Sequence, residues 1–151
     1  MSSKNARRRG REFALQGIYH WLLNPGSGFA AIESHLAQAA GFDKADQEIF
    51  ISRLRGTVGN ANSLDAAIAP FMERQVNELS PVEHAVLLLA AQELTHHLEV
   101  PYRVVINEAI ELTKEYGGTD GHRFVNGVLD KLAAQVRATE VEAAAKARKA
   151  P

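Results

Sequence analysis

The chain of 151 residues contains no cysteine. This absence excludes a disulfide framework, a thiolate metal site and a cysteine nucleophile, and it is typical of a reducing compartment. No stretch reaches the ~18 consecutive apolar residues that a membrane-spanning helix needs. The basic N-terminus lacks the contiguous apolar segment and the small-residue cleavage site of a secretory signal. We therefore expect a cytoplasmic protein that does not enter the membrane.

The first eleven residues contain no acidic residue, but they contain five basic ones: Lys4, Arg7, Arg8, Arg9 and Arg11. The whole chain has 17 Lys and Arg against 18 Asp and Glu, so the bases outside this cluster number 12 against 18 acids. Like charges at close spacing repel one another unless an anionic partner offsets them. The phosphate backbone of a nucleic acid is the usual partner.

Helical spacing places this basic cluster at the start of an amphipathic helix. Its core-facing residues are spaced by three and four: Ala6, Gly10, Phe13, Ala14, Gly17, Ile18 and Trp21. The neighbouring flank carries Lys4, Arg8, Arg11, Leu15 and Tyr19. A row of cations that ends in an aromatic ring suits single-stranded RNA, because guanidinium groups hold phosphates while a ring stacks on an unpaired base. The alternative is a solvated basic helix end with a partly buried tyrosine.

Helical periodicity dominates the rest of the chain, and no strand alternation persists. The first helix should end before the breaker cluster at 24–28, and later helical patterns are separated at Gly41, Pro70, Val100-Pro101 and Gly117-Gly118. No internal repeat is visible. The sequence therefore predicts an all-α protein.

Two helix starts carry N-cap signals. Asp43 or Asp46 can cap the third helix. Ser80, Pro81 and Glu83 supply a cap serine, a proline at the first helical position and a glutamate three residues after the serine, which together predict a capping box. The helix that follows is apolar almost all the way round, so we expect it to be the buried central helix.

A last helix should open near Thr119 or Asp120. The length and the 46% hydrophobic content fit one domain that buries roughly two-thirds of its unfolded surface. We expect residues 1–137 to form this single domain. Residues 138–151 are rich in Ala, Glu and Lys, and we expect them to be a frayed tail.

Enzymatic and metal chemistry find little support in the sequence. The phosphate-binding pattern Gly-x-x-x-x-Gly-Lys-Ser/Thr is absent, and the glycine-rich segment 117–121 is better explained as a helix C-cap and turn. Glu93 and His96 stand three apart, as in di-iron carboxylate bundles, but no second Glu-x-x-His pair is present. We expect His96 and His97 to be exposed near a helix end. The sequence thus predicts no enzyme, no metal and no cofactor.

Two polar pairs interrupt apolar helices, namely Asn107-Glu108 and Asn126-Gly127. A glycine in the middle of a helix costs about 1 kcal/mol relative to alanine. Gly127 therefore suggests either close helix–helix approach, which we favour, or room for a ligand backbone.

Three segments together resemble the NusB family of transcription antitermination factors. They are RRRGREFALQ at 7–16, VVINEAIEL at 104–112 and HRFVNGVLDKL at 122–132. The resemblance covers roughly residues 4–137, in order and without a large insertion. It implies a compact bundle of about seven helices in two packed helical subdomains.

The resemblance implies a factor that binds the boxA element of nascent ribosomal transcripts together with NusE, a small-subunit ribosomal protein, in a complex with other Nus factors on RNA polymerase. One alternative is a protein-interaction module that docks a basic ribosomal protein and has no RNA specificity of its own. The same module also occurs ahead of an RNA cytosine methyltransferase, which would require a downstream cofactor domain. Monomer and homodimer both stay open.

The resemblance also implies site residues. Those matching RNA-binding positions are Lys4, Arg7, Arg8, Arg11, Tyr19, Asp120 and Phe124, and those matching partner-binding positions are Tyr19 and Glu83. The family often has an arginine where this chain has Leu88. The N-terminal cluster is therefore expected to carry more of the RNA binding here.

Overall fold

A computed structural model describes residues 2–118 and 120–149. Every regular element in these ranges is helical, which confirms the predicted all-α class. The described residues form eight α-helices, which agrees roughly with the expected count of about seven: α1 Lys4–Leu23, α2 Phe29–Ala37, α3 Gln47–Gly59, α4 Ala61–Ile68, α5 Pro81–His96, α6 Tyr102–Tyr116, α7 Gly121–Val136 and α8 Ala138–Lys149. Three short 3₁₀ turns connect them: η1 Phe42–Lys44, η2 Ala69–Phe71 and η3 Val76–Glu78.

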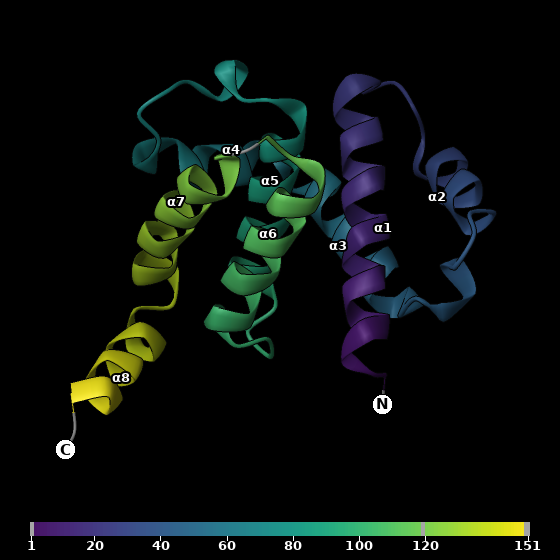
Figure 1. Cartoon of the computed structure of the whole chain (residues 1–151). Coiled ribbons are helices and arrows are strands. Elements are labelled where there is room, and N and C mark those ends of the chain that lie inside the picture. Colours follow the sequence, from purple (N-terminus) through teal and green to yellow (C-terminus); the bar gives the residue numbers. More distant parts are fainter. Residues whose placement is uncertain (1, 119, 150–151) are drawn as a thin grey trace.

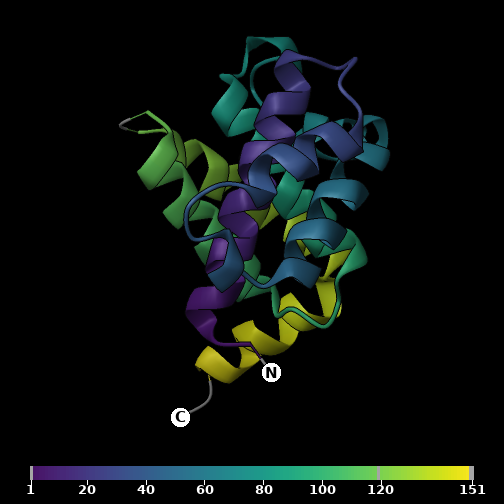
Figure 2. The ribbon, with the colours of Figure 1, turned by 90° about the vertical axis from the view of Figure 1, so that its right-hand side faces the viewer.

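Helix α5 lies at the centre of the molecule and contacts α1, α3, α4, α6 and α7 (Figure 1). Helix α1 packs along α3, while α2 lies on the outside of α1. Figures 1 and 2 both place the start of α1 and helix α8 at the lower end, and the end of α1 and the segment 72–80 at the upper end. The two ends of α1 therefore belong to opposite ends of the molecule.

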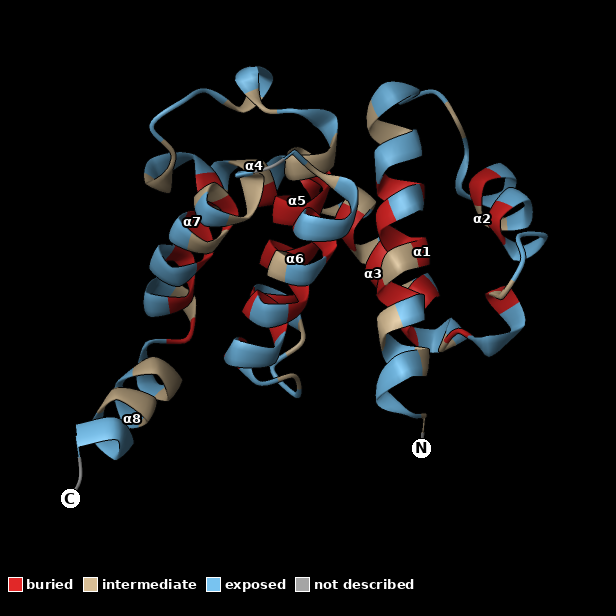
Figure 3. Cartoon of the chain, in the orientation of Figure 1, coloured by how far each residue is buried: buried red, intermediate tan, exposed pale blue. Residues whose placement is uncertain are grey.

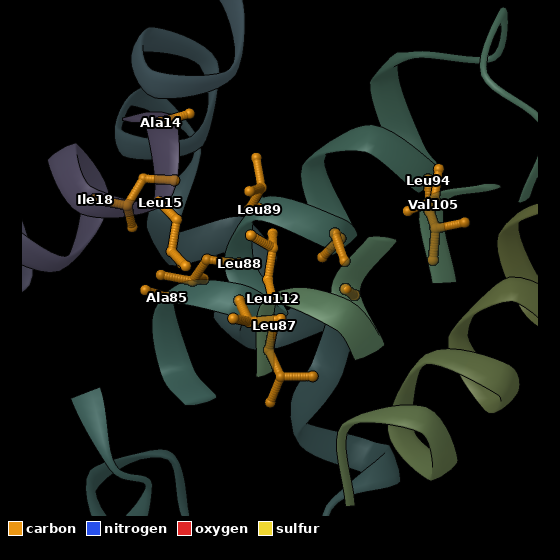
Figure 4. Close-up of a cluster of buried hydrophobic side chains, with 14 of the residues drawn as sticks. Ala14, Leu15, Ile18, Ala85, Leu87, Leu88, Leu89, Leu94, Val105 and Leu112 are labelled. Atoms are coloured by element: carbon orange, nitrogen blue, oxygen red, sulfur yellow. The ribbon is translucent and has the colours of Figure 1, made fainter. Parts of the chain in front are cut away.

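The prediction that the helix after Ser80 is the buried central one is confirmed. Every residue from 85 to 94 is buried, and the buried faces of the surrounding helices turn toward this segment (Figure 3). Leu87, Leu88 and Leu89 belong to one cluster of buried apolar side chains that includes residues of α1 and α6 (Figure 4). Leu88 has no exposed surface at all, so position 88 belongs to the core of this chain.

Both capping signals act at their predicted helices. Asp46, not Asp43, caps α3, because its carboxylate accepts a hydrogen bond from the amide of Ile49 at 3.0 Å. The hydroxyl of Ser80 accepts from the amide of Glu83 at 3.2 Å. The reciprocal bond of a capping box is replaced here, since the Glu83 carboxylate accepts from the Ser80 hydroxyl at 2.9 Å.

Residues 138–149 of the segment expected to be a frayed tail form helix α8 instead, and residues 150–151 lie outside the described ranges. Arg137, which is buried, donates from Nε to the carbonyl of Leu94 at 2.7 Å and from Nη2 to the carbonyl of His97 at 3.0 Å. Its Nη1 also pairs at 2.7 Å with Glu140, whose carboxylate accepts from the amide of Tyr102 at 2.8 Å. These polar contacts join the start of α8 to the end of α5 and to the first residue of α6. Val141 and Ala144 of α8 also pack against the core. The composition of the segment did not indicate this anchoring, because it depends on the long-range hydrogen bonds of Arg137.

The expectation of close packing at Gly127 is wrong, because this glycine is exposed and a β-carbon there would meet nothing within 4 Å. Close approach occurs instead at two glycines of α1. A β-carbon on Gly10 would lie 2.7 Å from the carbonyl oxygen of Asp46, and one on Gly17 would lie 2.8 Å from a methyl of Leu54. These glycines let α1 pack directly on α3. Among the described residues, no helix combines the length and the apolar character needed to span a bilayer.

Candidate nucleic-acid interface

Three of the five N-terminal cations have no carboxylate partner among the described residues, and we call them the free cations. Lys4, Arg7 and Arg9 lie in the first two turns of α1 and are exposed. No carboxylate forms a salt bridge with them in the ranges 2–118 and 120–149. Ser3 starts this helix, and its hydroxyl accepts from the amide of Ala6 at 3.0 Å. Arg7 also donates from Nη1 to the carbonyl of Ser2. The first two turns of α1 therefore carry three positive charges that no carboxylate neutralises, at one end of the molecule (Figure 1).

Arg8 is only partly available. Its Nε donates to Glu108 of α6 at 3.0 Å, and its side chain is 40% exposed whereas that of Glu108 is 8% exposed. The pair lies in a cleft of about 280 Å³ between α1 and α6, which Glu111, Lys114 and Glu115 also line. An RNA phosphate at Arg8 would have to compete with a nearly buried carboxylate in a cleft with more acidic than basic groups.

The expectation that Arg11 lies on an exposed basic flank is wrong. Arg11 is 3% exposed, and its guanidinium binds Glu93 of α5 through two hydrogen bonds of 2.8 and 3.0 Å. Arg53 of α3 donates to the same carboxylate at 3.1 and 3.3 Å. The predicted helical spacing of Lys4, Arg8, Arg11, Leu15 and Tyr19 is correct. However, α1 packs on α5 along part of this flank, which buries Leu15 as well as Arg11. Arg11 is therefore a structural residue in this fold.

In this Arg11–Glu93–Arg53 triad, burial and ion pairing shift the pKa values of Glu93 and Arg11 in opposite directions. Burial of Glu93 would raise the pKa of its carboxyl, but the hydrogen bonds and charges of Arg11 and Arg53 outweigh burial and hold the pKa below its usual value. Burial would lower the pKa of Arg11, but Glu93 outweighs it and raises that pKa. Both groups are thus held in their charged forms.

Sequence reasoning considered Glu93 only as a metal ligand beside His96. In the structure His96 is exposed while Glu93 is buried, and the described residues contain no cluster of His, Cys, Asp or Glu suited to a metal ion. A usable signal was present, because a glutamate inside an otherwise apolar helix has to be paired. The sequence did not show which cations pair with it.

The other predicted residues gather toward the opposite end of α1. Tyr19 is 38% exposed and lies fifteen residues after Lys4, or about 22 Å along the helix axis. Asp120 is exposed at the start of α7, and Phe124 is half-buried in the first turn of that helix. Glu83 lies against the same helix start, since a β-carbon on Gly121 would be 3.3 Å from its carboxyl carbon. The predicted residues therefore form two groups and not one patch.

An apolar pocket of about 420 Å³ lies beside Tyr19. Its wall combines α1, α2, the first turn of α5 and the end of α6, including Leu23, Ile32, Val82 and Tyr116. The hydroxyl of Tyr116 donates to Glu12 of α1 at 2.9 Å. Burial and the neighbouring Glu12 carboxylate raise the pKa of Tyr116, so this hydroxyl stays protonated. Sequence reasoning did not identify this pocket, because its residues come from four separate segments.

Comparison with known proteins agrees with the fold and the motifs. The model of the NusB family matches residues 8–134. The transcription antitermination protein NusB of Aromatoleum aromaticum is 68% identical over 143 residues, which cover 95% of this chain and 98% of that protein. The protein of the same name from Azoarcus sp. is 61% identical over 145 residues, which cover 95% and 93%.

Solved structures show the same architecture. T. maritima NusB has a TM-score of 0.80 and 28% identity, and the match covers 94% of this chain and 99% of that one. A chain in a crystal structure of the antitermination factors NusB and NusE with double-stranded RNA has a TM-score of 0.74 over 86% of this chain and 97% of its own length, but at 22% identity it shows the fold alone. The family match over most of the chain and the nearly full-length relatives lead to one conclusion: this chain belongs to the NusB family.

Proposed function

We propose that this chain is a transcription antitermination factor that binds boxA-type single-stranded RNA in nascent ribosomal transcripts together with NusE, within a complex on RNA polymerase. The observation that carries the proposal is the 68% identity, over nearly the whole of both chains, to a protein named for transcription antitermination. The free cations Lys4, Arg7 and Arg9 support an RNA contact at the start of α1. The packing of helices on either side of α5 supports the proposed division into two helical subdomains.

RNA binding should depend on the free cations at the start of α1. A triple variant in which Lys4, Arg7 and Arg9 become alanine should bind boxA RNA more weakly, because three phosphate contacts are lost. For a single strand, three contacts correspond to a slope of about −2 in log K against log salt, and this slope should approach zero in the variant. Melting should change little, since exposed charges contribute little to stability. Fluorescence anisotropy over a salt series measures both quantities.

A matched control is available at α8, where Lys146, Arg148 and Lys149 are also exposed. Replacing these three by alanine changes the net charge by the same amount and should leave the salt slope unchanged. Equal losses in both triple variants would mean that net charge alone governs binding. A parent protein that prefers boxA RNA no more than an unrelated strand, even with NusE present, would contradict the proposal.

For the partner we propose the surface that joins Glu83 to the apolar pocket beside Tyr19. Val82 lines that pocket and its neighbour Glu83 lies half-buried against the start of α7. A partly exposed aromatic ring beside an apolar pocket is typical of protein interfaces. Outside the N-terminal cluster the chain has more acids than bases, which favours a basic ribosomal protein as the partner.

Glu83→Gln should separate docking from helix capping. Glutamine can still accept the hydrogen bond from Ser80, so stability should change by only a few tenths of a kcal/mol. Loss of the carboxylate charge should weaken NusE binding, more at low salt than at high salt. Calorimetric titration at two salt concentrations measures the effect, with Glu142→Gln on the exposed side of α8 as the control of equal charge. Unchanged NusE affinity in Glu83→Gln would move the interface elsewhere.

A protein-interaction module without RNA specificity stays the second candidate. The observation that favours it is the internal pairing of Arg8 with Glu108 and of Arg11 with Glu93. Because of this pairing, Arg11 is not available to RNA and Arg8 is only partly available. The cationic surface is therefore smaller than the sequence suggests. The two triple variants distinguish the candidates, because a pure protein-interaction module would show no boxA preference to lose.

A further inference from the structure

We infer that the groove between α6, α7 and α8 binds an acidic, extended segment of a partner protein. This groove has a volume of about 390 Å³, and residues of all three helices line it. On α6, its residues Ile106 and Ile110 lie on the side opposite Glu108, which lines the cleft that holds Arg8. The groove is thus separate from the proposed RNA contact at the start of α1, and the inference does not depend on the proposed function.

The two asparagines that interrupt apolar helices both line this groove. Asn107 of α6 is exposed and Asn126 of α7 is half-buried, and neither side chain makes a hydrogen bond within residues 2–118 and 120–149. Asparagine is a weak helix former, so helix stability does not explain either residue. A carboxamide has both donors and an acceptor, which match the carbonyl and the amide of a peptide unit. The two asparagines are therefore suited to hold the backbone of an extended chain.

An aliphatic surface lies beside these amides. Ile106 is buried, whereas Ile110 and Val141 are half-buried, and all three line the groove. From Arg103 to Ile110 the helix advances about 10 Å, which is the length of about three residues of extended peptide. A bound segment could therefore place one aliphatic side chain on this surface while the asparagines hold its backbone.

The charges at the groove favour an acidic segment. Arg103 and Arg148 line it together with Asp130, and no salt bridge within the described ranges engages any of the three. Lys146 and Lys149 lie in the same last turn of α8 as Arg148. This local excess of bases differs from the chain outside its first eleven residues, where acids outnumber bases. Carboxylates of a partner would therefore complement the rim of the groove.

RNA is the rival occupant, because arginines also hold phosphates. The lining favours a peptide for two reasons. The Tyr102 ring in the lining is only 8% exposed, so an unpaired base could not stack on it. Asp130 would repel a phosphate, whereas the aliphatic surface suits the side chains of a protein.

A phage library of random short peptides, panned against the full chain, supplies the probe. We expect the enriched peptides to share acidic residues and at least one aliphatic residue. The most enriched peptide is then labelled with a fluorophore, and a neutral version replaces each of its Asp and Glu residues by Asn and Gln. In anisotropy titrations the acidic peptide should bind more tightly than the neutral one, and the difference should be larger at low salt.

Two double variants of the chain test the roles of the groove residues. Asn107→Ala with Asn126→Ala should weaken peptide binding roughly 10- to 30-fold, because two hydrogen bonds to the peptide backbone are lost. Melting should not fall in this variant, since alanine is the better helix former. Arg103→Gln with Arg148→Gln should weaken binding of the acidic peptide roughly 2- to 10-fold and should leave binding of the neutral peptide unchanged.

The matched control is Gln16→Ala with Asn24→Ala, which removes two exposed carboxamides from the apolar pocket beside Tyr19. This control should bind the peptide as the parent does, and both groove variants should bind boxA RNA as the parent does. The inference is overturned if no peptide is enriched, if the enriched peptides lack acidic residues, or if the control pair loses as much affinity as the asparagine pair. Weaker boxA binding by the groove variants would assign the groove to RNA and would also overturn it.

Discussion

Replacing Glu93 by glutamine should lower the free energy of unfolding by about 3–5 kcal/mol, one of the largest effects expected for a single substitution in this protein. The Glu93 side chain is 2% exposed and neutralises two guanidinium groups, those of Arg11 and Arg53, whose side chains are 4% and 7% exposed. Without the carboxylate, two positive charges remain buried and close together. Urea unfolding followed by circular dichroism measures the loss.

Glu99→Gln provides the matched control, because Glu99 is also close to Arg53, at 3.9 Å, but its side chain is 64% exposed. Its removal should cost less than about 1 kcal/mol, as is usual for exposed ion pairs. A Glu93→Gln protein that unfolds at the same denaturant concentration as Glu99→Gln would show that the buried triad contributes no more than a surface contact.

Acidification offers a second measurement of the same contribution. The pKa of Glu93 is lower in the folded chain than its usual value of 4.5. A carboxyl with a lowered pKa stabilises the fold fully above that usual value, and the contribution is lost as the pH falls through the folded pKa. The stability difference between the parent and Glu93→Gln should therefore be constant near pH 7 and should shrink below about pH 4.5. A difference that stays constant down to pH 2 would contradict this account.

Phe50→Ala should cost about 3–5 kcal/mol, the range for truncating a buried aromatic side chain. Phe50 is 2% exposed and packs edge-on against Phe42 and Phe13, with ring centroids 5.1 and 6.5 Å away. Phe42 and Phe13 also pack on each other, with centroids 5.2 Å apart. The truncation would leave a cavity among α1, η1 and α3 where these rings now interlock.

The control for this truncation is Phe29→Ala at the start of α2, where the ring is 37% exposed. It removes the same atoms, but much of the side chain is already hydrated, so the loss should be well under half of that for Phe50→Ala. Thermal and urea unfolding of the two variants under identical conditions compare them. Equal losses of unfolding free energy would mean that the buried Phe50 ring stabilises the fold no more than the partly hydrated Phe29 ring does.

The positions of most helices were predictable from local rules. Helix α1 ends at Leu23 before the breaker cluster, Asp46 and Ser80 cap the helices that follow them, and α6 ends at Tyr116 before two glycines. These features depend on residues within about four positions of one another. The burial of α5 was also predictable, because a helix that is apolar on all sides can be stable only inside a core.

The roles of the charged residues needed the tertiary structure. Arg8 and Arg11 are three residues apart in one helical row, but one lies at the edge of a cleft and the other inside the core. Arg74 reaches the ring of Phe124, fifty residues later, and Arg137 anchors α8 through carbonyl groups of α5. Helical periodicity predicts which residues share a face, and through it the all-α class and the buried helix. Whether a cation on that face meets solvent or a carboxylate 82 residues away depends on how the helices pack, because long-range ion pairs form only between side chains that packing has already brought together.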